Sequence, residues 1–131
     1  MSFQTLRWAF RLHAVYFFAW ALFFELLPEE LMRFLGLDLP DNPVSWIATS
    51  VAAGGMVTVG VLFWLAAGHK RPPRIALGAA LIQTSFNLYH ASIWILAYRA
   101  RHQFWLVLLD ACIVAVFFAI YFRAWRTWER A

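Results

Sequence analysis

Charge and cysteine are scarce in this 131-residue chain. Only 14% of its residues are charged, whereas a soluble domain carries roughly a quarter. The single cysteine, Cys112, excludes an internal disulfide, paired-thiol chemistry and any zinc or iron–sulfur site built from several cysteines. Gly-rich phosphate loops and the GxSxG motif are also missing, so no familiar catalytic motif identifies a reaction.

Hydrophobic residues, in contrast, make up 63% of the chain and occur in runs too long for the strands of a soluble core. We therefore predict an all-α membrane protein, in which four transmembrane helices form an antiparallel bundle within one domain, residues 1–131. The first run lacks the small-residue cleavage site of a signal peptide, so we expect it to be retained. The predicted spans cover approximately residues 8–27, 44–67, 75–98 and 104–122.

The longest connection, residues 28–43, has amphipathic character. Leu31, Phe34 and Leu35 share one helical face, and Gly36 follows as a helix stop. This pattern predicts a short helix lying on the membrane surface after the first span. An ordinary structured loop is the alternative.

The distribution of basic residues predicts the orientation. With alternating spans, eight Lys and Arg residues fall on one side and three on the other. Both termini are therefore expected in the cytoplasm, with the protein in the inner membrane. The net charge of +4 has the same explanation, because the basic residues cluster at span ends; nucleic acid is not expected as a partner.

The third predicted span carries an unusual polar seam. Gln83, Asn87 and His90 fall within an arc of about 60° on a helix, and Trp94 extends this stripe. Polar groups at membrane depth are costly and seldom face lipid. The seam is therefore predicted to face other helices or a cavity.

The fourth predicted span contains one acid, Asp110. It lies about 9 Å from the outer end of its helix, and His90 lies about 12 Å from the outer end of the preceding helix. We expect the two side chains to meet and to act as one unit, as catalytic candidates in a polar pocket in the outer half of the bundle. The candidate ligand-binding residues are Tyr16, Trp20, Ser50, Gln83, Asn87, His90, Trp94 and Asp110. A purely structural hydrogen-bond network is the alternative.

The spacing of the histidines does not indicate a particular haem, chlorophyll or metal site. His13 and His90 lie near opposite ends of their spans, which excludes a haem ligated by both. A haem or chlorophyll held by one histidine stays open, so the cofactor is unknown. No HxxxH-type motif is present, and no metal site is predicted.

Small residues in the second predicted span indicate close helix packing. Ser50 and Gly54 form a small-xxx-small pair, and Gly55 follows. We predict that Gly54 and Gly55 contact a neighbouring helix of the same chain. A dimer interface is the alternative.

Three stretches carry a resemblance to a known group. They are FELLPEELMRFLGL (residues 24–37), TSVAAGGMVTVGVLFWLAA (residues 49–67) and the polar third span. In these the chain resembles the small bacterial four-helix membrane proteins called DoxX-like. That group includes accessory subunits of quinone-linked oxidoreductases, so the resemblance implies a fold more than an activity. There is a looser likeness to sterol-isomerase-type pockets, although this chain lacks their second buried acid.

Three functional hypotheses follow from these observations. The first is a binding or accessory subunit of a larger, possibly redox, membrane complex. The second is a small membrane enzyme or carrier that acts on a lipid, isoprenoid or quinone through His90 and Asp110. The third is a purely structural oligomer. The expected partners are the bilayer, a membrane protein or a second copy, and a lipophilic small molecule; whether the protein is an enzyme stays open.

Overall fold

The computed structural model describes residues 2–27, 29–30, 33, 43–98 and 104–128. Four long helices account for nearly all of these residues, and the described ranges contain no strand. The all-α prediction is therefore confirmed. The helices are α1 (Phe3–Leu26), α3 (Pro43–Gly68), α4 (Arg74–Tyr98) and α5 (Phe104–Thr127).

The helix boundaries follow the predicted spans, with extensions at two ends. Helix α1 begins at Phe3 rather than near residue 8, because Ser2 caps it: the Ser2 hydroxyl accepts a hydrogen bond from the backbone N–H of Thr5 at 3.2 Å. Helix α5 continues to Thr127, beyond the expected end at residue 122. The predicted amphipathic segment, 28–43, lies mostly outside the described residues.

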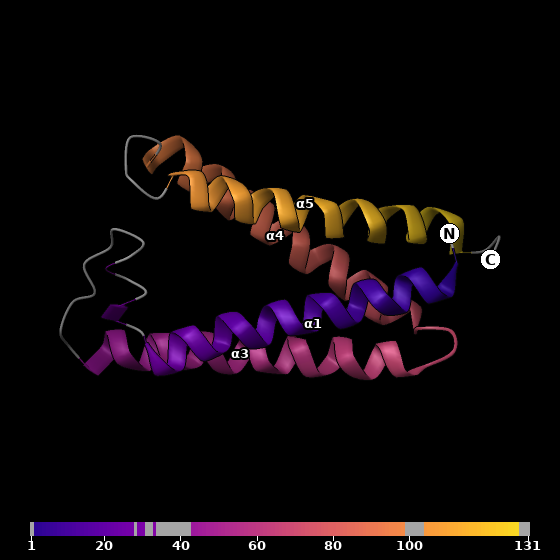
Figure 1. The fold of residues 1–131 in the computed structure, drawn as a ribbon, viewed down its shortest axis with the longest axis horizontal. Coiled ribbons are helices and arrows are strands. Elements are labelled where there is room, and N and C mark those ends of the chain that lie inside the picture. The colour runs from indigo at the N-terminus through magenta and orange to yellow at the C-terminus, as the bar shows by residue number, and fades with distance from the viewer. Residues whose placement is uncertain (1, 28, 31–32, 34–42, 99–103, 129–131) are drawn as a thin grey trace.

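The helices associate as two pairs, α1 with α3 and α4 with α5. In Figure 1 the start of α1, the turn after α3 and the end of α5 lie at the same end of the molecule. The two pairs come together toward this end and separate toward the opposite one (Figure 1). This arrangement leaves one half of the structure closely packed and the other half more open.

The buried core lies in the closely packed half. Phe10 of α1 stands at its centre, with its ring centroid 5.3 Å from that of Phe63 in α3 and 5.1 Å from that of Tyr121 in α5. All three side chains are almost completely buried. Leu77 and Ala80 add the contribution of α4 to the same cluster. Aromatic packing therefore joins the two helix pairs here.

The prediction that Gly54 and Gly55 contact a neighbouring helix is wrong, and the close contact of α3 is at Gly60. Gly54 and Gly55 are exposed, and a Cβ atom built on either would meet nothing within 4 Å. A Cβ on Gly60, in contrast, would lie 2.6 Å from the Phe18 ring of α1. The buried face of α3 contains Ala53 and Gly60, and successive helical residues are rotated by about 100°. Gly54 and Gly55 therefore point away from this face.

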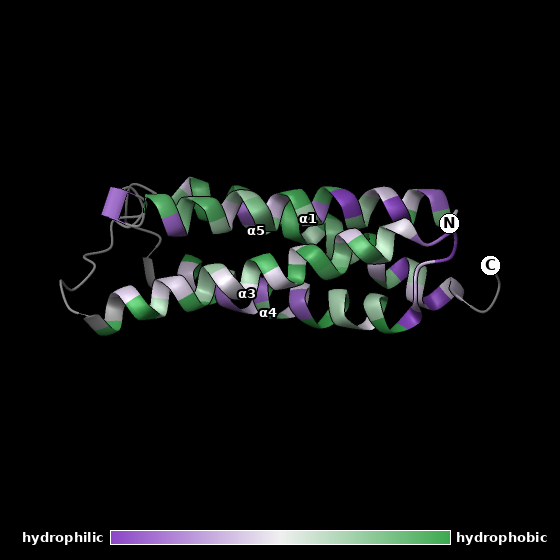
Figure 2. Ribbon diagram, turned by 90° about the horizontal axis from the view of Figure 1, so that it is seen from below, coloured by the Kyte–Doolittle hydropathy of each residue, from purple (hydrophilic) through white to green (hydrophobic). Residues whose placement is uncertain are grey.

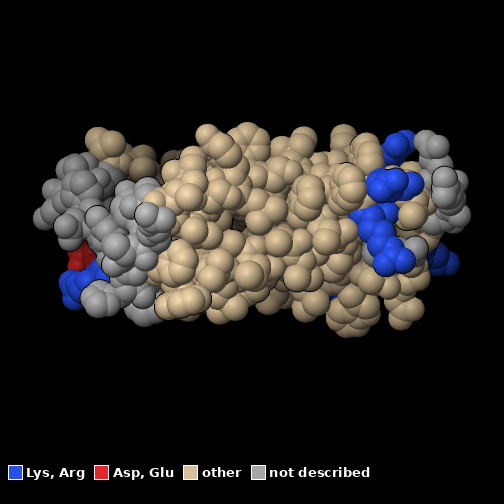
Figure 3. All heavy atoms as spheres, turned by 90° about the horizontal axis from the view of Figure 1, so that it is seen from above, with Lys and Arg blue, Asp and Glu red and all other residues tan. Residues whose placement is uncertain are grey.

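The surface is that of a membrane protein. Helices α1 and α5 and the segment Trp46–Gly68 of α3 are long and apolar enough to cross a bilayer. Helix α4 has a similar length, but its polar residues lower its hydropathy. Hydrophobic residues cover most of the helices in Figure 2, and on the face in Figure 3 charged residues are confined to the two ends. Large apolar side chains are openly exposed, such as Ile75 at 84% and Leu96 at 74%, as lipid contact requires.

Candidate functional site

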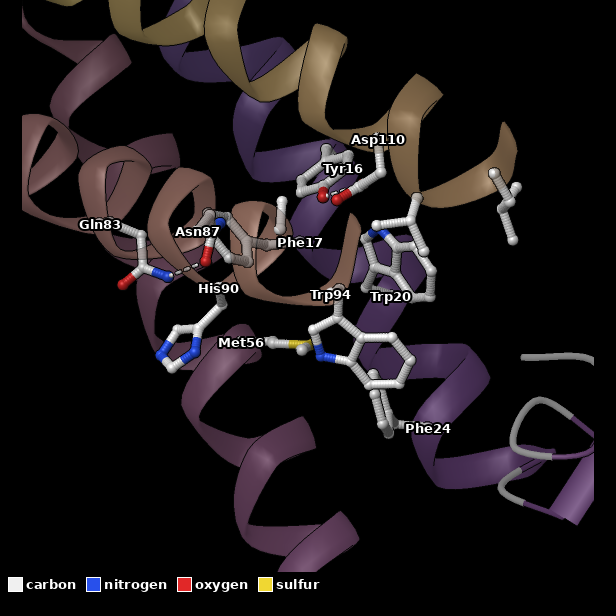
Figure 4. Close-up of a pocket in the computed structure, with 13 residues that line it drawn as sticks. Tyr16, Phe17, Trp20, Phe24, Met56, Gln83, Asn87, His90, Trp94 and Asp110 are labelled. Carbon is white, nitrogen blue, oxygen red and sulfur yellow. Dashed lines mark hydrogen bonds between the residues drawn. The ribbon is translucent and has the colours of Figure 1, made fainter. Parts of the chain in front are cut away.

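A cavity of about 270 Å³ occupies the more open half, between the two helix pairs (Figure 4). All four helices contribute to it. Its wall is mainly aromatic and aliphatic, with a small number of hydrogen-bonding side chains among the apolar ones. The lining residues are Tyr16, Phe17, Trp20, Phe24, Met56, Gln83, Asn87, His90, Ala91, Trp94, Leu106, Val107 and Asp110.

The structure brings together seven of the eight candidate binding residues from the sequence, and Ser50 is the exception. Ser50 is exposed on α3, and its hydroxyl donates a hydrogen bond to Glu25 Oε2 at 3.3 Å. It lies instead in a shallow surface hollow with Trp46, Ile47 and Val51. Ser50 is therefore not part of the cavity, although its depth along the helix is similar.

One hydrogen bond in the cavity joins α1 to α5. The Tyr16 hydroxyl donates a hydrogen bond to Asp110 Oδ1 at 2.5 Å. The Trp20 side chain, one turn along α1, approaches both members of this pair. The bond joins side chains that belong to different helix pairs. Tyr16 therefore links the two helix pairs in the half where they otherwise separate.

This pairing corrects the expected contact between His90 and Asp110. Both side chains line the cavity, but no hydrogen bond joins them in the described structure. His90 is exposed, and its ring lies near Phe86 and Tyr89 of its own helix, with centroid distances of 6.4 Å and 5.4 Å. Asp110 faces α1 across the cavity instead. Similar depth on neighbouring helices was not sufficient for contact.

The polar seam of α4 forms the opposite wall. Gln83 Nε2 donates a hydrogen bond to Asn87 Oδ1 at 3.3 Å, one helical turn away. After this bond, the Asn87 amide group keeps its N–H donors and Gln83 keeps its carbonyl acceptor. Figure 4 shows Gln83, Asn87 and His90 along one side of the cavity and Tyr16 and Asp110 on another. The site therefore offers both donors and acceptors.

Aromatic rings make up much of the rest of the cavity wall. Trp20 of α1 and Trp94 of α4 appear beside each other in Figure 4, and the side chain of Met56 in α3 points toward Trp94. Phe17 and Phe24 complete the α1 side. Ligand sites in proteins typically combine such apolar walls with a few placed polar groups. The arrangement is suited to a flat or ring-shaped group with hydrogen-bonding substituents.

A second buried polar pair lies beside the cavity, toward the packed core. His13 Nδ1 and the Tyr121 hydroxyl are 3.1 Å apart, and that hydroxyl also donates to the carbonyl of Ala9 at 3.4 Å. The His13 ring stacks on Phe117 with centroids 4.3 Å apart. His13 is completely buried, and its Nε2 has no hydrogen-bond partner in the described part of the chain.

The sequence analysis did not single out Tyr121, although a signal was present. Val114, Phe117, Tyr121 and Ala124 are the buried residues of α5 and recur at spacings of three and four. Asp110 lies four residues before Val114 and continues the same stripe. Extending the stripe from Asp110 along the helix would have placed Tyr121 on the same face of α5 as Asp110.

Comparisons with known proteins add no identification. No family model matches the chain, and no curated protein or solved structure matches it either. The resemblance to DoxX-like proteins therefore stays a prediction. Within the described ranges, no three His, Cys, Asp or Glu side chains are grouped as a metal site would require. The cavity itself is consequently the basis for a functional proposal.

Proposed function

We propose that this protein binds a lipophilic small molecule whose polar head occupies the cavity between the two helix pairs. The observation that carries the proposal is the composition of the wall: Tyr16 with Asp110 on one side, Asn87 with His90 on the other, and aromatic residues around them. In this proposal α4 also crosses the membrane, so that the four spans alternate in direction. Its polar seam then faces the ligand and not the lipid.

The volume limits which part of a ligand can enter. Ligand pockets commonly measure roughly 300–1,000 Å³, and this cavity, at about 270 Å³, is slightly smaller. It therefore accepts a head group about the size of one ring. A hydrocarbon tail would extend from the cavity, where the two helix pairs separate, into the surrounding lipid.

The polar groups narrow the chemistry of that head. Asp110 and the Gln83 carbonyl accept hydrogen bonds, and the Asn87 amide and the His90 ring can donate them. A ring or chain end bearing hydroxyl or carbonyl groups satisfies both kinds of partner. Quinones, quinols and isoprenoid alcohols belong to this class.

We favour ligand binding over the accessory-subunit hypothesis because the lining of the cavity comes from one chain and needs no partner. In the proposed topology, both termini lie in the cytoplasm and the cavity lies in the outer half of an inner-membrane protein. The basis for this orientation is the eight-to-three distribution of basic residues. Whether bound molecules are also chemically changed is a separate question, for which His90 and Asp110 are the candidate groups.

Mass spectrometry of the purified protein tests the proposal. Protein extracted in mild detergent should carry a lipophilic compound with oxygen-containing head chemistry, detected in organic extracts. Asn87→Leu should reduce its amount, because the substitution removes a hydrogen-bonding group without touching the Tyr16–Asp110 bond. Ser50→Ala is the matched control, since Ser50 lies outside the cavity. Equal retention by both variants, or no such compound in the wild type, would refute the proposal.

A further inference from the structure

Among the described residues, one end of the molecule carries basic side chains and no acidic ones. Seven basic residues lie there, and the described acids lie elsewhere: Glu25, Glu29 and Glu30 toward the opposite end, and Asp110 in the cavity. Figure 3 shows Lys and Arg gathered at this end of the visible face. We call it the basic end; its residues are Arg7, Arg11, Lys70, Arg71, Arg74, Arg123 and Arg126.

Arg71, in the turn between α3 and α4, is the best-positioned cation of this set. Its guanidinium lies over two aromatic rings, 5.2 Å from the centroid of Phe3 in α1 and 5.1 Å from that of Trp128 after α5. Its Nη2 also donates a hydrogen bond to the Trp128 carbonyl at 3.3 Å. These contacts orient the guanidinium. None of its contacts in the described part of the chain is with a carboxylate.

Two further cations belong to the same part of the basic end: Lys70 is adjacent to Arg71 in sequence, and Arg7 contacts the end of α3 just before the turn. Lys70 precedes Arg71 in the same exposed turn. Arg7, one turn after Phe3 in α1, donates from Nε to the carbonyl of Ala67 at the end of α3, at 2.8 Å. The guanidinium of Arg7 in α1 is therefore held against the end of α3, four residues before Arg71.

Arginine held in this way is suited to phosphate. The planar guanidinium presents several donors in a fixed geometry that matches phosphate oxygens. The position next to the helix ends points to a lipid, because exposed apolar side chains continue from this end along the molecule. Leu65 is 60% exposed and Ile75 is 84% exposed, so acyl chains could lie against them. Trp125 and Trp128 are of the type found at membrane interfaces.

We propose that Arg71, with Lys70 and Arg7, binds the phosphate of an anionic phospholipid headgroup in the leaflet at the basic end. The site is separate from the cavity, which lies in the other half of the molecule. The lipid supplies the negative charge that the described residues at this end lack. Bound lipid would also contact the start of α1, the turn after α3 and the end of α5 together, since Arg71 joins all three.

Native mass spectrometry in a neutral detergent, with phosphatidylglycerol or phosphatidylcholine of the same chain length, tests this site. The wild type should retain phosphatidylglycerol in preference to phosphatidylcholine. Arg71→Gln should weaken phosphatidylglycerol binding about fivefold, since each cation near an anionic membrane surface contributes roughly that factor. Arg33→Gln is the matched control, because Arg33 is an exposed cation at the opposite end, and it should leave binding unchanged.

Two further variants separate the effect of charge from that of the planar guanidinium and from a loss of folding. Arg71→Lys retains the charge but not the planar guanidinium, so its affinity should fall between those of the wild type and Arg71→Gln. If Arg71→Gln does not fold, Lys70→Gln replaces it and should still lower phosphatidylglycerol binding, while Arg33→Gln should not. Equal losses for substitutions at the two ends would overturn the proposal. Loss of the phosphatidylglycerol preference on adding inorganic phosphate would overturn the lipid assignment and indicate a site for free phosphate.

Discussion

The hydrogen bond between Tyr16 and Asp110 should stabilise the more open half of the protein measurably. Replacing Tyr16 with Phe deletes only the hydroxyl and leaves the ring in place, so packing is preserved. The deletion removes the donor 2.5 Å from Asp110 Oδ1 in a partly buried site. A buried acceptor that loses its partner costs about 1–3 kcal/mol. Because the Trp20 side chain still approaches Asp110, we expect Tyr16→Phe to fall in the lower half of that range.

Asp110→Leu supplies the second arm of the experiment. In a Tyr16→Phe background it removes the acceptor that would otherwise stay buried without its donor. Replacing both partners with apolar groups of similar shape can be nearly neutral. The double variant should therefore be more stable than Tyr16→Phe alone. Polar interactions between membrane helices average about 0.6 kcal/mol in double-mutant cycles, with a maximum near 1.7; we expect a coupling energy within this range for the bond between Tyr16 and Asp110.

The wild type, Tyr16→Phe, Asp110→Leu and the double variant form a double-mutant cycle. Reversible unfolding in mixed detergent micelles, followed by tryptophan fluorescence, gives the free energy of unfolding of each of these four proteins. A second cycle with His90→Ala and Asp110→Leu is the control, and its effects should be additive, because Tyr16, not His90, is the hydrogen-bond partner of Asp110. Additive losses in the first cycle would refute the assignment of the bond. A larger coupling energy in the His90 cycle would restore the pairing expected from the sequence.

Two further predictions concern packing and topology. Gly60→Leu should destabilise the protein by about 1–3 kcal/mol through overpacking against α1, whereas Gly54→Leu, in open space, should change the unfolding free energy little. The reverse order would show that Gly54, and not Gly60, faces a neighbouring helix. In a Cys112→Ser background, Arg33→Cys should react with an impermeant thiol reagent added outside intact cells and Lys70→Cys should not, because basic residues favour the cytoplasmic side. Labelling of Lys70→Cys alone would invert the proposed orientation.

The helices and most of the cavity lining could be predicted from the sequence because they depend on local patterns. Long apolar runs located the four helices to within a few residues, apart from the capped start of α1 and the extended end of α5. The stripe of Gln83, Asn87 and His90 identified one wall of the cavity, since spacings of three and four place residues on one helical face. These inferences need only the geometry of a single helix.

Contacts between helices could not be predicted in the same way. Pairing Asp110 with His90 required the rotation and separation of two helices, whereas the structure shows that Asp110 faces Tyr16 on a third. The glycines of α3 illustrate the same limit. Gly54, Gly55 and Gly60 are equally small, but only Gly60 lies on the side that meets α1. Which side is buried depends on the partner helix, and that information is not local.

The concentration of the core in one half of the molecule gives the protein unequal stiffness along its length. Phe10, Phe63 and Tyr121 connect the two helix pairs at one end, while a hydrogen bond between Tyr16 and Asp110 joins them across the cavity. If the proposed ligand binds there, a head group larger than the cavity would require a change in the angle between the pairs, and that change need not disturb the aromatic cluster. Selectivity for the proposed ligand would then depend more on hydrogen bonds to its head group than on tight steric fit, so related molecules with different tails should compete for the cavity on similar terms.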